Sequence, residues 1–278
     1  MASDSGLAHS NSARGALAPG NLIRIGHGTL ALDIAPDAGG RIAQIARADV
    51  DWLVGYSDDN AAMIAWGSYP MLPWAGRIRH GRFAFQEKKY QLPLNLEEHA
   101  IHGVGFAMPW SVQARSKNYV ELSLQLPEDE RWPFGGTARQ RIEVTENTVR
   151  MHLSVTAHER VMPAVIGWHP WFRKPDRLDF QPSAFYPRDA EGIAVRPLAE
   201  PPPGPWDDCF INTKAVLLHR DGQHLRLTSD CTHWVIYDAP PHATCIEPQS
   251  DPPDAFNLEP VAIAPGNSLA AWFLLEWL

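Results

Sequence analysis

The chain has 278 residues, of which 45% are hydrophobic and 20% are charged, a composition typical of folded globular proteins and not of disordered or fibrous ones. Its formal net charge of -8 argues against a broad basic surface for nucleic acid or for an anionic membrane. No apolar run reaches the length of about eighteen residues that a membrane-spanning helix needs. We therefore expect a protein that binds neither nucleic acid nor membrane.

The N-terminal residues 1–20 are rich in Ser, Ala, Gly and Asn and lack the apolar core of a signal peptide. We expect this segment to be a disordered tail, followed by one domain over residues 21–278. The cysteines Cys209, Cys231 and Cys245 form no CxxC spacing and leave one thiol over in any disulfide scheme. This pattern predicts neither a zinc knuckle nor a disulfide scaffold, and it favours a cytoplasmic location.

The first regular segments alternate apolar with small or polar residues. Leu30, Leu32 and Ile34 follow this period of two, as does the run from Val120 to Leu126. Because successive side chains of a strand point to opposite faces, such alternation predicts half-buried β-strands. Between 138 and 156 the same pattern is interrupted at Glu146-Asn147, which predicts a hairpin.

The C-terminal half continues in the same way. Asp221-Gly222 separates two alternating runs between 215 and 229, and this dipeptide tolerates the positive φ angles of a tight hairpin turn. Residues 233–239 and 269–277 predict two further strands. No helical face of twelve or more residues is apparent, while 25 prolines and 20 glycines punctuate the chain. We therefore predict an all-β fold, a large antiparallel β-sandwich, with residues 196–210 as a long functional loop rather than a domain linker.

Four stretches place an ionisable residue beside Gly, Pro or an aromatic residue. They are "MLPWAGRIRHGRF", "EEHAIHGVGF", "IGWHPWF" and "CIEPQSDPPDAFN". Arg77 and Arg79 stand two positions apart in a strand-like segment, and we expect one of them alone to point into a shared cavity. Glu247 follows a buried run, where charged residues are seldom found without a purpose. The plainer interpretations are surface arginines, a solvated strand end and a core histidine at His169.

The order of these stretches resembles the aldose 1-epimerase (galactose mutarotase-like) family from about Ile23 to the C-terminus. "GWHPWF" and "EPQSDPPDAFN" carry most of the resemblance. It implies a galactose mutarotase-like supersandwich with an open sugar-binding cleft. It further implies interconversion of the α and β anomers of a free aldose such as galactose or glucose, without cofactor or metal.

The resemblance also implies roles for individual residues. Glu247 corresponds to the catalytic base, His169 to the catalytic acid, and His102 to a third catalytic residue near the ring oxygen. The residues that correspond to substrate-binding positions are Arg77, Asp207, Trp171 and His99, with Asp208 a weaker match than Asp207. The chemistry agrees, because opening a sugar ring needs one group to take the proton of the anomeric hydroxyl and another to protonate the ring oxygen. Ordinary pKa values of about 4.3 for glutamate and about 6.5 for histidine suit these two tasks near neutrality.

Departures from the family pattern leave the sugar itself open. Gly76 stands where many relatives carry Asn, His99 also replaces Asn, and Trp171 replaces Tyr. We expect a small-molecule sugar as the partner, and a monomer or homodimer.

Three other functions remain open from the residues. A hexose-6-phosphate 1-epimerase of the same fold would need extra cations, for which the candidates are Arg79, Arg82, Arg139 and Arg141. A non-catalytic carbohydrate-binding protein would use the aromatic residues and arginines but not the acid and the base. A metal-dependent β-sandwich or cupin-like enzyme would use as ligands His99, His102, His169 and Glu247.

Overall fold

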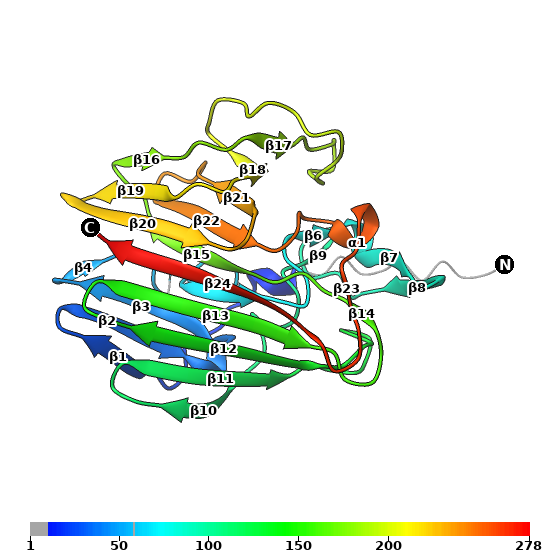
Figure 1. Cartoon of the computed structure of the whole chain (residues 1–278), viewed down its shortest axis with the longest axis horizontal. Coiled ribbons are helices and arrows are strands. Elements are labelled where there is room, and N and C mark those ends of the chain that lie inside the picture. The colour runs from blue at the N-terminus through cyan, green and yellow to red at the C-terminus, as the bar shows by residue number, and fades with distance from the viewer. Residues whose placement is uncertain (1–10, 58) are drawn as a thin grey trace.

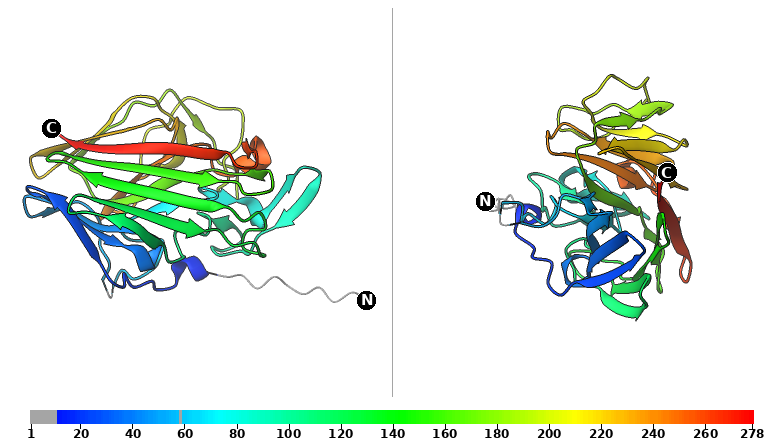
Figure 2. Two further views of the ribbon diagram at one scale, coloured as in Figure 1. Left: turned by 60° about the horizontal axis from the view of Figure 1, so that its bottom comes forward. Right: turned by 90° about the vertical axis from the view of Figure 1, so that its left-hand side faces the viewer.

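The structure is a computed structural model that describes residues 11–57 and 59–278. Two large antiparallel sheets form the body of the molecule, with helix confined to short turns in the described part of the chain (Figure 1). The two sheets lie as layers against each other, and small hairpins extend from one end (Figure 2). The predicted all-β antiparallel sandwich is therefore confirmed.

Within the described residues, ten strands form the first sheet and eight form the second. In spatial order the first contains β1 (Ile23–His27), β2 (Leu30–Ala35), β3 (Arg41–Arg47), β5 (Ser68–Met71), β15 (Gly167–Arg173), β22 (Ala243–Gln249), β21 (His233–Tyr237), β18 (Asp207–Ile211) and β17 (Ala184–Tyr186), with β4 (Val50–Asp51) paired to β3. The second contains β10 (Ser111–Arg115), β11 (Tyr119–Gln125), β12 (Thr137–Val144), β13 (Thr148–Thr156), β24 (Ser268–Trp277), β20 (Gln223–Ser229), β19 (Val216–Arg220) and β16 (Arg177–Asp179).

Short elements complete the described fold. The small strand pairs are β6 (Arg77–Ile78) with β9 (Ala100–Ile101), β7 (Arg82–Phe85) with β8 (Lys88–Gln91), and β14 (Met162–Pro163) with β23 (Ala262–Ile263). The helical turns are α1 (Ala255–Leu258), η1 (Ser12–Arg14), η2 (Pro36–Ala38) and η3 (Arg79–Gly81). No helix in the described residues is long and apolar enough to cross a membrane.

The sequence periodicity explains the strands and their turns. Strand β13 alternates buried and more exposed residues along its whole length, so its apolar side chains face the opposite sheet. The predicted hairpin at Glu146-Asn147 joins β12 to β13, and the one at Asp221-Gly222 joins β19 to β20. Asp221 and Gly222 have φ angles of 51° and 71°, the left-handed conformation that the dipeptide predicts.

One large hydrophobic core lies between the sheets. Trp168 of β15 is fully buried and its ring lies 5.8 Å from that of Phe273 in β24. Trp52 and Trp277 meet edge to face at 5.6 Å in the same core. Because these large rings fill the inner faces of both sheets, the first sheet is held as a rigid support for the residues on its other face.

The N-terminal segment differs from the expectation of a disordered tail. Residues 11–20 are packed on the domain: Ala13 is 1% exposed, its N–H donates to the Asn95 carbonyl at 2.9 Å, and Ala16 forms a bridge with Ala62. Residues 1–10 lie outside the described residues. The alanines of this segment are small enough to fill space against the core, and a composition-based reading cannot detect such packing.

Candidate active site

The register of the first sheet brings several predicted site residues onto one face. The pairs Gly167↔Gln249 and Trp171↔Cys245 align β15 with β22, so His169 lies opposite Glu247. On the other side of β15, Tyr69 of β5 is the direct partner of His169. Because paired residues of neighbouring strands point to the same face, Tyr69, His169 and Glu247 form a row across the sheet.

A second row lies one pleat further along the same face. Trp171 is paired with Cys245, Cys245 with Tyr237, and Tyr237 with Asp207. Trp171 and Cys245 lie two positions from His169 and Glu247 in their strands, so the side chains of both rows point the same way. Asp207 therefore faces the same space as Glu247, from a strand two places away in the sheet.

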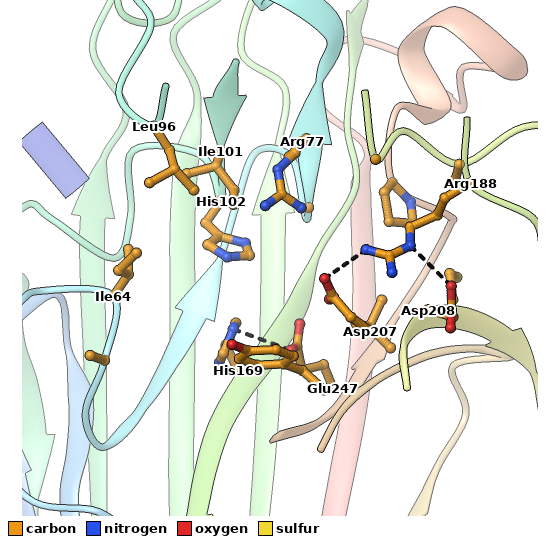
Figure 3. Close-up of a pocket in the computed structure, with 18 of the residues that line it drawn as sticks. Ile64, Arg77, Leu96, Ile101, His102, His169, Arg188, Asp207, Asp208 and Glu247 are labelled. Atoms are coloured by element: carbon orange, nitrogen blue, oxygen red, sulfur yellow. Dashed lines mark hydrogen bonds and ion pairs between the residues drawn. The ribbon is translucent and has the colours of Figure 1, made fainter. Parts of the chain in front are cut away.

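A cavity of about 270 Å³ covers these two rows. This volume is close to the lower end of the range for small-molecule sites, about 300 Å³. Among the residues that line it are six of the seven predicted from the sequence: Arg77, His102, His169, Trp171, Asp207 and Glu247. Figure 3 shows His169 and Glu247 at the base of the cavity, with Arg77 and His102 on one side and Asp207 on the other.

His169 and Glu247 form a buried pair at the centre of the site. Nε2 of His169 lies 3.2 Å from Oε1 of Glu247, and the two residues are 6% and 3% exposed. Both line the cavity, so a ligand there can reach either group. The pair thus offers one proton donor and one proton acceptor side by side.

Burial changes the charge state that we expected for this pair. Removal from water raises the pKa of Glu247 well above its usual value, an effect that Asp207 strengthens and Arg77 opposes. Burial also lowers the pKa of His169 to about 3. Burial thus favours a protonated Glu247 and a neutral His169, whereas the sequence suggested an ionised glutamate and a protonated histidine.

The imidazole of His169 stacks against two aromatic rings. The Tyr69 ring lies at 4.7 Å and 23°, and the Trp171 ring at 5.5 Å and 22°. Trp171 also lines the cavity, whereas Trp168, on the opposite face of β15, is buried in the core. Of the eleven tryptophans, all within the described chain, Trp171 is the one that lines this cavity. The histidine of "GWHPWF" thus stands in a rigid aromatic slot.

Behind Tyr69 lies a buried arginine that the sequence analysis did not single out. Arg41 is 0% exposed, and its guanidinium donates to the carbonyl oxygens of Ala38, Met63, Trp66 and Phe106 at 2.6 to 3.0 Å. It also lies over the Tyr69 ring, 4.9 Å from its centroid. Its positive charge contributes to the lowered pKa of His169. No local pattern around "GGRIA" distinguishes this arginine from a surface one.

His102 reaches the cavity from the loop after β9. Its backbone is in the left-handed region at φ 61°, and its N–H donates to the Gly76 carbonyl at 3.0 Å. The next residue, Gly103, packs against Leu72 so closely that a Cβ would lie 1.9 Å from the Leu72 oxygen. Only glycine fits there, which explains the glycine after this histidine. Burial, with His169 and Arg77 nearby, lowers the pKa of His102 well below its usual value.

Of the two arginines Arg77 and Arg79, one alone enters the cavity, as expected, but the turn and not their spacing separates them, because residues two positions apart in one strand share a face. Arg77, in β6, lines the cavity, while Arg79 begins the turn η3 and pairs outside the cavity with Asp189 and Glu191. The predicted continuous strand is wrong at this point, because Arg79 already belongs to the turn.

Asp207 has an ionic partner that sequence reasoning missed. Arg188 donates from Nη1 to Asp207 at 2.6 Å and from Nε to Asp208 at 3.0 Å, and all three residues line the cavity (Figure 3). Arg188 lies in the connection between β17 and β18, so its approach to the aspartates depends on how that connection folds. The one signal in the sequence was the dipeptide Asp207-Asp208, because two adjacent carboxylates favour a cation nearby.

Known proteins identify the family. The sequence model described as "Aldose 1-epimerase" matches residues 21–276. The chain belongs to the aldose 1-epimerase family. Its sequence is 30% identical to the Escherichia coli K12 protein YphB over 151 residues, which is 53% of this chain and 50% of YphB. It is 35% identical to YihR from the same organism over 68 residues, which is 23% of this chain and 21% of YihR. The chain thus spans about half the length of YphB and about a fifth of YihR.

Solved structures show that the fold is shared. A candidate aldose 1-epimerase from Escherichia coli K12 superposes with a TM-score of 0.83 at 22% identity, covering 93% of this chain and 99% of that one. A GalM/aldose epimerase homologue from C. elegans gives 0.81 at 16% identity, covering 93% and 98%. Galactose 1-epimerase from Lactobacillus acidophilus NCFM gives 0.75 at 18% identity, covering 90% and 91%. The resemblance seen in the sequence is confirmed at the level of family and fold.

Within this aldose 1-epimerase fold, His99 is not where we expected it. It is 6% exposed and does not line the cavity; its Nδ1 accepts the backbone N–H of His80 at 3.2 Å. The rings of His80 and His99 lie 5.4 Å apart. His99 therefore supports the turn η3 and is not placed to touch a ligand. His99 and His102 flank β9 and lie on different sides, as residues three positions apart in an extended segment do.

Gly76 has a local explanation in this member of the family. Its φ is 65°, and a Cβ there would lie 2.7 Å from Pro253. An asparagine at this position, as in many relatives, would need Pro253 to move. The glycine and the proline of "DPP" thus form one wall of the cavity together.

The residues nominated for a phosphate site do not line the cavity. Arg79 is paired as described, Arg82 donates to Gln91 at 2.9 Å, and Arg141 pairs with Glu121 and Glu143. Arg139 lies in β12 of the second sheet, whereas Glu247 lies in β22 of the first. These positions provide no observation in favour of the sugar-phosphate alternative.

The four metal ligands considered from the sequence are not assembled either. Among the described residues, the group close enough to share a metal ion is His169, Cys245 and Glu247, whose ligand atoms lie within 4.8 Å of one another. His99 lies outside the cavity and His102 is not in this group. Burial raises the pKa of the Cys245 thiol well above its usual value, so this residue is a neutral thiol.

Proposed function

We propose that this chain interconverts the α and β anomers of a free aldose, as an aldose 1-epimerase (mutarotase). The observation that carries the proposal is the contact between His169 and Glu247, 3.2 Å apart at the base of a cavity. Mutarotation needs a proton acceptor and a proton donor within reach of two oxygens on the same sugar carbon, and this pair supplies them. Membership of the family supports the same reaction.

In the proposed reaction, the Glu247 carboxylate takes the proton of the C1 hydroxyl. The C1–O1 bond becomes a carbonyl while the bond from C1 to the ring oxygen breaks, and its electron pair stays on that oxygen. His169, as imidazolium, donates its proton to the ring oxygen. Rotation about C1–C2 exposes the other face of the carbonyl, and the reverse steps close the ring and return both protons.

The proposal requires one proton transfer within the pair before ring opening. Burial favours a protonated Glu247 and a neutral His169, which together contain the same number of protons as the carboxylate and imidazolium. Moving the proton across the 3.2 Å contact therefore needs no exchange with solvent. Arg77, which lowers the pKa of Glu247, favours this transfer, and sugar hydroxyls that donate to the carboxylate would favour it further.

The other lining residues take supporting roles. Arg77 offers a planar set of N–H donors to sugar hydroxyl oxygens, and Asp207 accepts from sugar hydroxyls. His102 lies with its ring 4.9 Å from that of His169, close enough to bind the oxygen on which charge develops. Trp171 provides an apolar wall for one face of the sugar.

Proton NMR or polarimetry of freshly dissolved α-anomers tests the proposal. Glucose, galactose, xylose, arabinose and fucose are compared with and without the protein, against spontaneous mutarotation in the same buffer. We expect the protein to accelerate the mutarotation of at least one of these sugars. Glu247→Gln and His169→Asn should each lower kcat roughly 10²- to 10⁴-fold. The matched controls Glu146→Gln and His27→Asn change the same residue types at exposed positions and should retain activity.

Two results would contradict the proposal. One is a wild-type protein that leaves every sugar at its spontaneous rate. The other is wild-type activity in both Glu247→Gln and His169→Asn with a folded spectrum, because the pair would then not perform the chemistry.

A further inference from the structure

The connection between β17 and β18 begins with a compact hairpin, residues 187–195. Val195 N–H donates to the Pro187 carbonyl at 2.8 Å, and Gly192 N–H to the Asp189 carbonyl at 3.0 Å. The Asp189 side chain accepts the N–H groups of Glu191 and Ile193 at 2.9 and 3.1 Å. Ile193 is 1% exposed, so the hairpin is anchored by burial as well as by its own hydrogen bonds. Residues 187–195 therefore form an ordered, hydrogen-bonded hairpin.

This hairpin forms one end of the cavity. Arg188, Gly192 and Ala194 are among the lining residues. Glu247 lies in β22, and Asp207 lies in β18 with β21 between them. Two strand spacings correspond to roughly 10 Å. Glu247 and Asp207, which Arg188 of the hairpin contacts, are therefore about two strand spacings apart, a distance that one sugar ring with its hydroxyls can bridge.

The tip of the hairpin is tied to the opposite side of the cavity. Arg79 of η3 pairs with Asp189, and with Glu191 at 2.9 Å. Nε2 of His80, in the same turn, lies 3.2 Å from the Glu191 carboxylate. Since η3 directly follows β6, which carries Arg77, this latch joins the two sides of the cleft. The hairpin is thus held across the end of the cavity at its tip and at its base.

Inside the cavity the hairpin presents Arg188. Its guanidinium donates to both Asp207 and Asp208, so it fixes the orientation of the Asp207 carboxylate toward the cavity. The two carboxylates balance the charge of Arg188, so this arginine leaves no surplus positive charge at the hairpin end of the cavity. A neutral sugar ring suits this end.

We infer that hairpin 187–195 restricts this site to free monosaccharides and excludes saccharides extended at their non-reducing end. Arg188 is the positioning residue that sets Asp207 against the hydroxyls of that single ring. The inference rests on the proposed function, because it concerns the substrate of the same site. A reducing disaccharide with its anomeric carbon at His169 and Glu247 would have to place its second ring where the hairpin stands.

The test compares galactose and glucose with lactose and maltose, in mutarotation kinetics and in calorimetric binding. The wild type should have a kcat/KM at least about 100-fold higher for the monosaccharides than for the disaccharides. It should also bind the monosaccharides with a lower Kd. Arg79→Gln removes the latch and should raise the disaccharide to monosaccharide ratio about tenfold, with monosaccharide turnover nearly unchanged. Arg82→Gln, which touches Gln91 and not the hairpin, is the matched control and should leave the ratio unchanged.

A second variant tests Arg188 directly. Arg188→Gln should raise the KM for monosaccharides about tenfold with kcat within about threefold, and Arg188→Lys should restore part of the loss. The positioning role would be overturned if Arg188→Gln lowered kcat by as much as it raised KM and if Arg188→Lys restored neither. Arg188 would then merely maintain the fold.

The binding arm separates this inference from the proposed function. Equal binding of monosaccharides and disaccharides by the wild type would overturn the inference, even if mutarotation occurs. Selective monosaccharide binding without any catalysis would overturn the proposed function and leave the inference standing. If Arg79→Gln weakened the binding of monosaccharides and disaccharides equally, the proposed role of the latch would also be overturned.

Discussion

Tyr69 lies flat against the imidazole of His169, with ring centroids 4.7 Å apart and planes inclined by 23°. The two residues are direct partners in the register of β5 and β15, so the stack follows from strand pairing. Tyr69 is itself fully buried, and its hydroxyl donates to the Ile64 carbonyl at 3.1 Å. The proposed acid thus gains its orientation from the rigid sheet beneath it.

Replacing the aromatic ring should therefore impair catalysis more than replacing the hydroxyl. We expect Tyr69→Leu to lower kcat at least about tenfold, because a loosely held acid loses much of its effect. Tyr69→Phe keeps the stack and should remain within about threefold of the wild type. Mutarotation kinetics of both variants decide this, and equal activity of the two would show that the stack does not orient His169.

The activity should persist to unusually low pH. Burial lowers the pKa of His169 to about 3 and raises that of Glu247, so the pair keeps the same number of protons across the ordinary histidine range. A profile of kcat/KM should therefore show no inflection near pH 6.5, and its acid limb should lie toward pH 3. The alkaline limb should reflect loss of the proton from the pair. A clear transition at pH 6.5 would mean that His169 titrates as an ordinary, hydrated histidine.

Glu247→Gln should stabilise the fold at neutral pH while abolishing activity. Glu247 ionises in the unfolded chain above about pH 4.5 but keeps its proton to higher pH when folded, so stability is lost as pH rises through this window. Because Gln does not titrate, the variant should have a higher Tm than the wild type at pH 7.5. This gain should vanish near pH 4.5.

Thermal denaturation of Glu247→Gln beside Glu146→Gln, an exposed glutamate, checks this account. The exposed substitution should leave Tm within about 1 °C at both pH values. A fall in the Tm of Glu247→Gln at pH 7.5 would mean that the ionised pair is the stable form.

Arg41 should be essential for stability through its geometry as well as its charge. Its four carbonyl acceptors come from separate backbone segments, at Ala38, Met63, Trp66 and Phe106. Arg41→Met leaves these buried oxygens unpaired, and we expect a loss of about 3–5 kcal/mol in the free energy of unfolding. Arg41→Lys keeps the charge but lacks the planar set of donors, so it should rescue little. Denaturant unfolding tests this, with exposed Arg139→Met as control.

Gly103 provides a test of the loop that carries His102. Both Gly103 and Gly222 have positive φ angles, of 75° and 71°, but a Cβ at Gly103 would lie 1.9 Å from the Leu72 oxygen and one at Gly222 meets nothing within 4 Å. Gly222→Ala should therefore cost about 1 kcal/mol for its backbone conformation. Gly103→Ala should cost about 3 kcal/mol more and also reduce activity. Similar unfolding midpoints for the two would show that the loop yields to the clash.

The amino-acid sequence determined the fold class because period-two alternation is a local property. The runs that form β2, β11, β13 and β24, and the turn at Asp221-Gly222, are legible without any knowledge of their partners. The motifs around His169 and Glu247 were legible in the same way, since each is a short contiguous stretch. Local signals did not separate Arg77 from Arg79, because residues two positions apart in a strand share a face and the turn that begins at Arg79 was not predicted.

Only the tertiary structure decided which residues meet and in what charge state. His99 and His102 flank β9, and the assembled fold places His99 against the turn η3 and His102 at the cavity. Arg188 reaches Asp207 through the folding of hairpin 187–195, and Arg41 reaches its carbonyls through segments up to 65 residues distant. The pKa values of His169 and Glu247 depend on burial, which is a property of all the surrounding chain. Long-range packing and desolvation have no signature in a local pattern, so these features emerge only when the sheet is assembled.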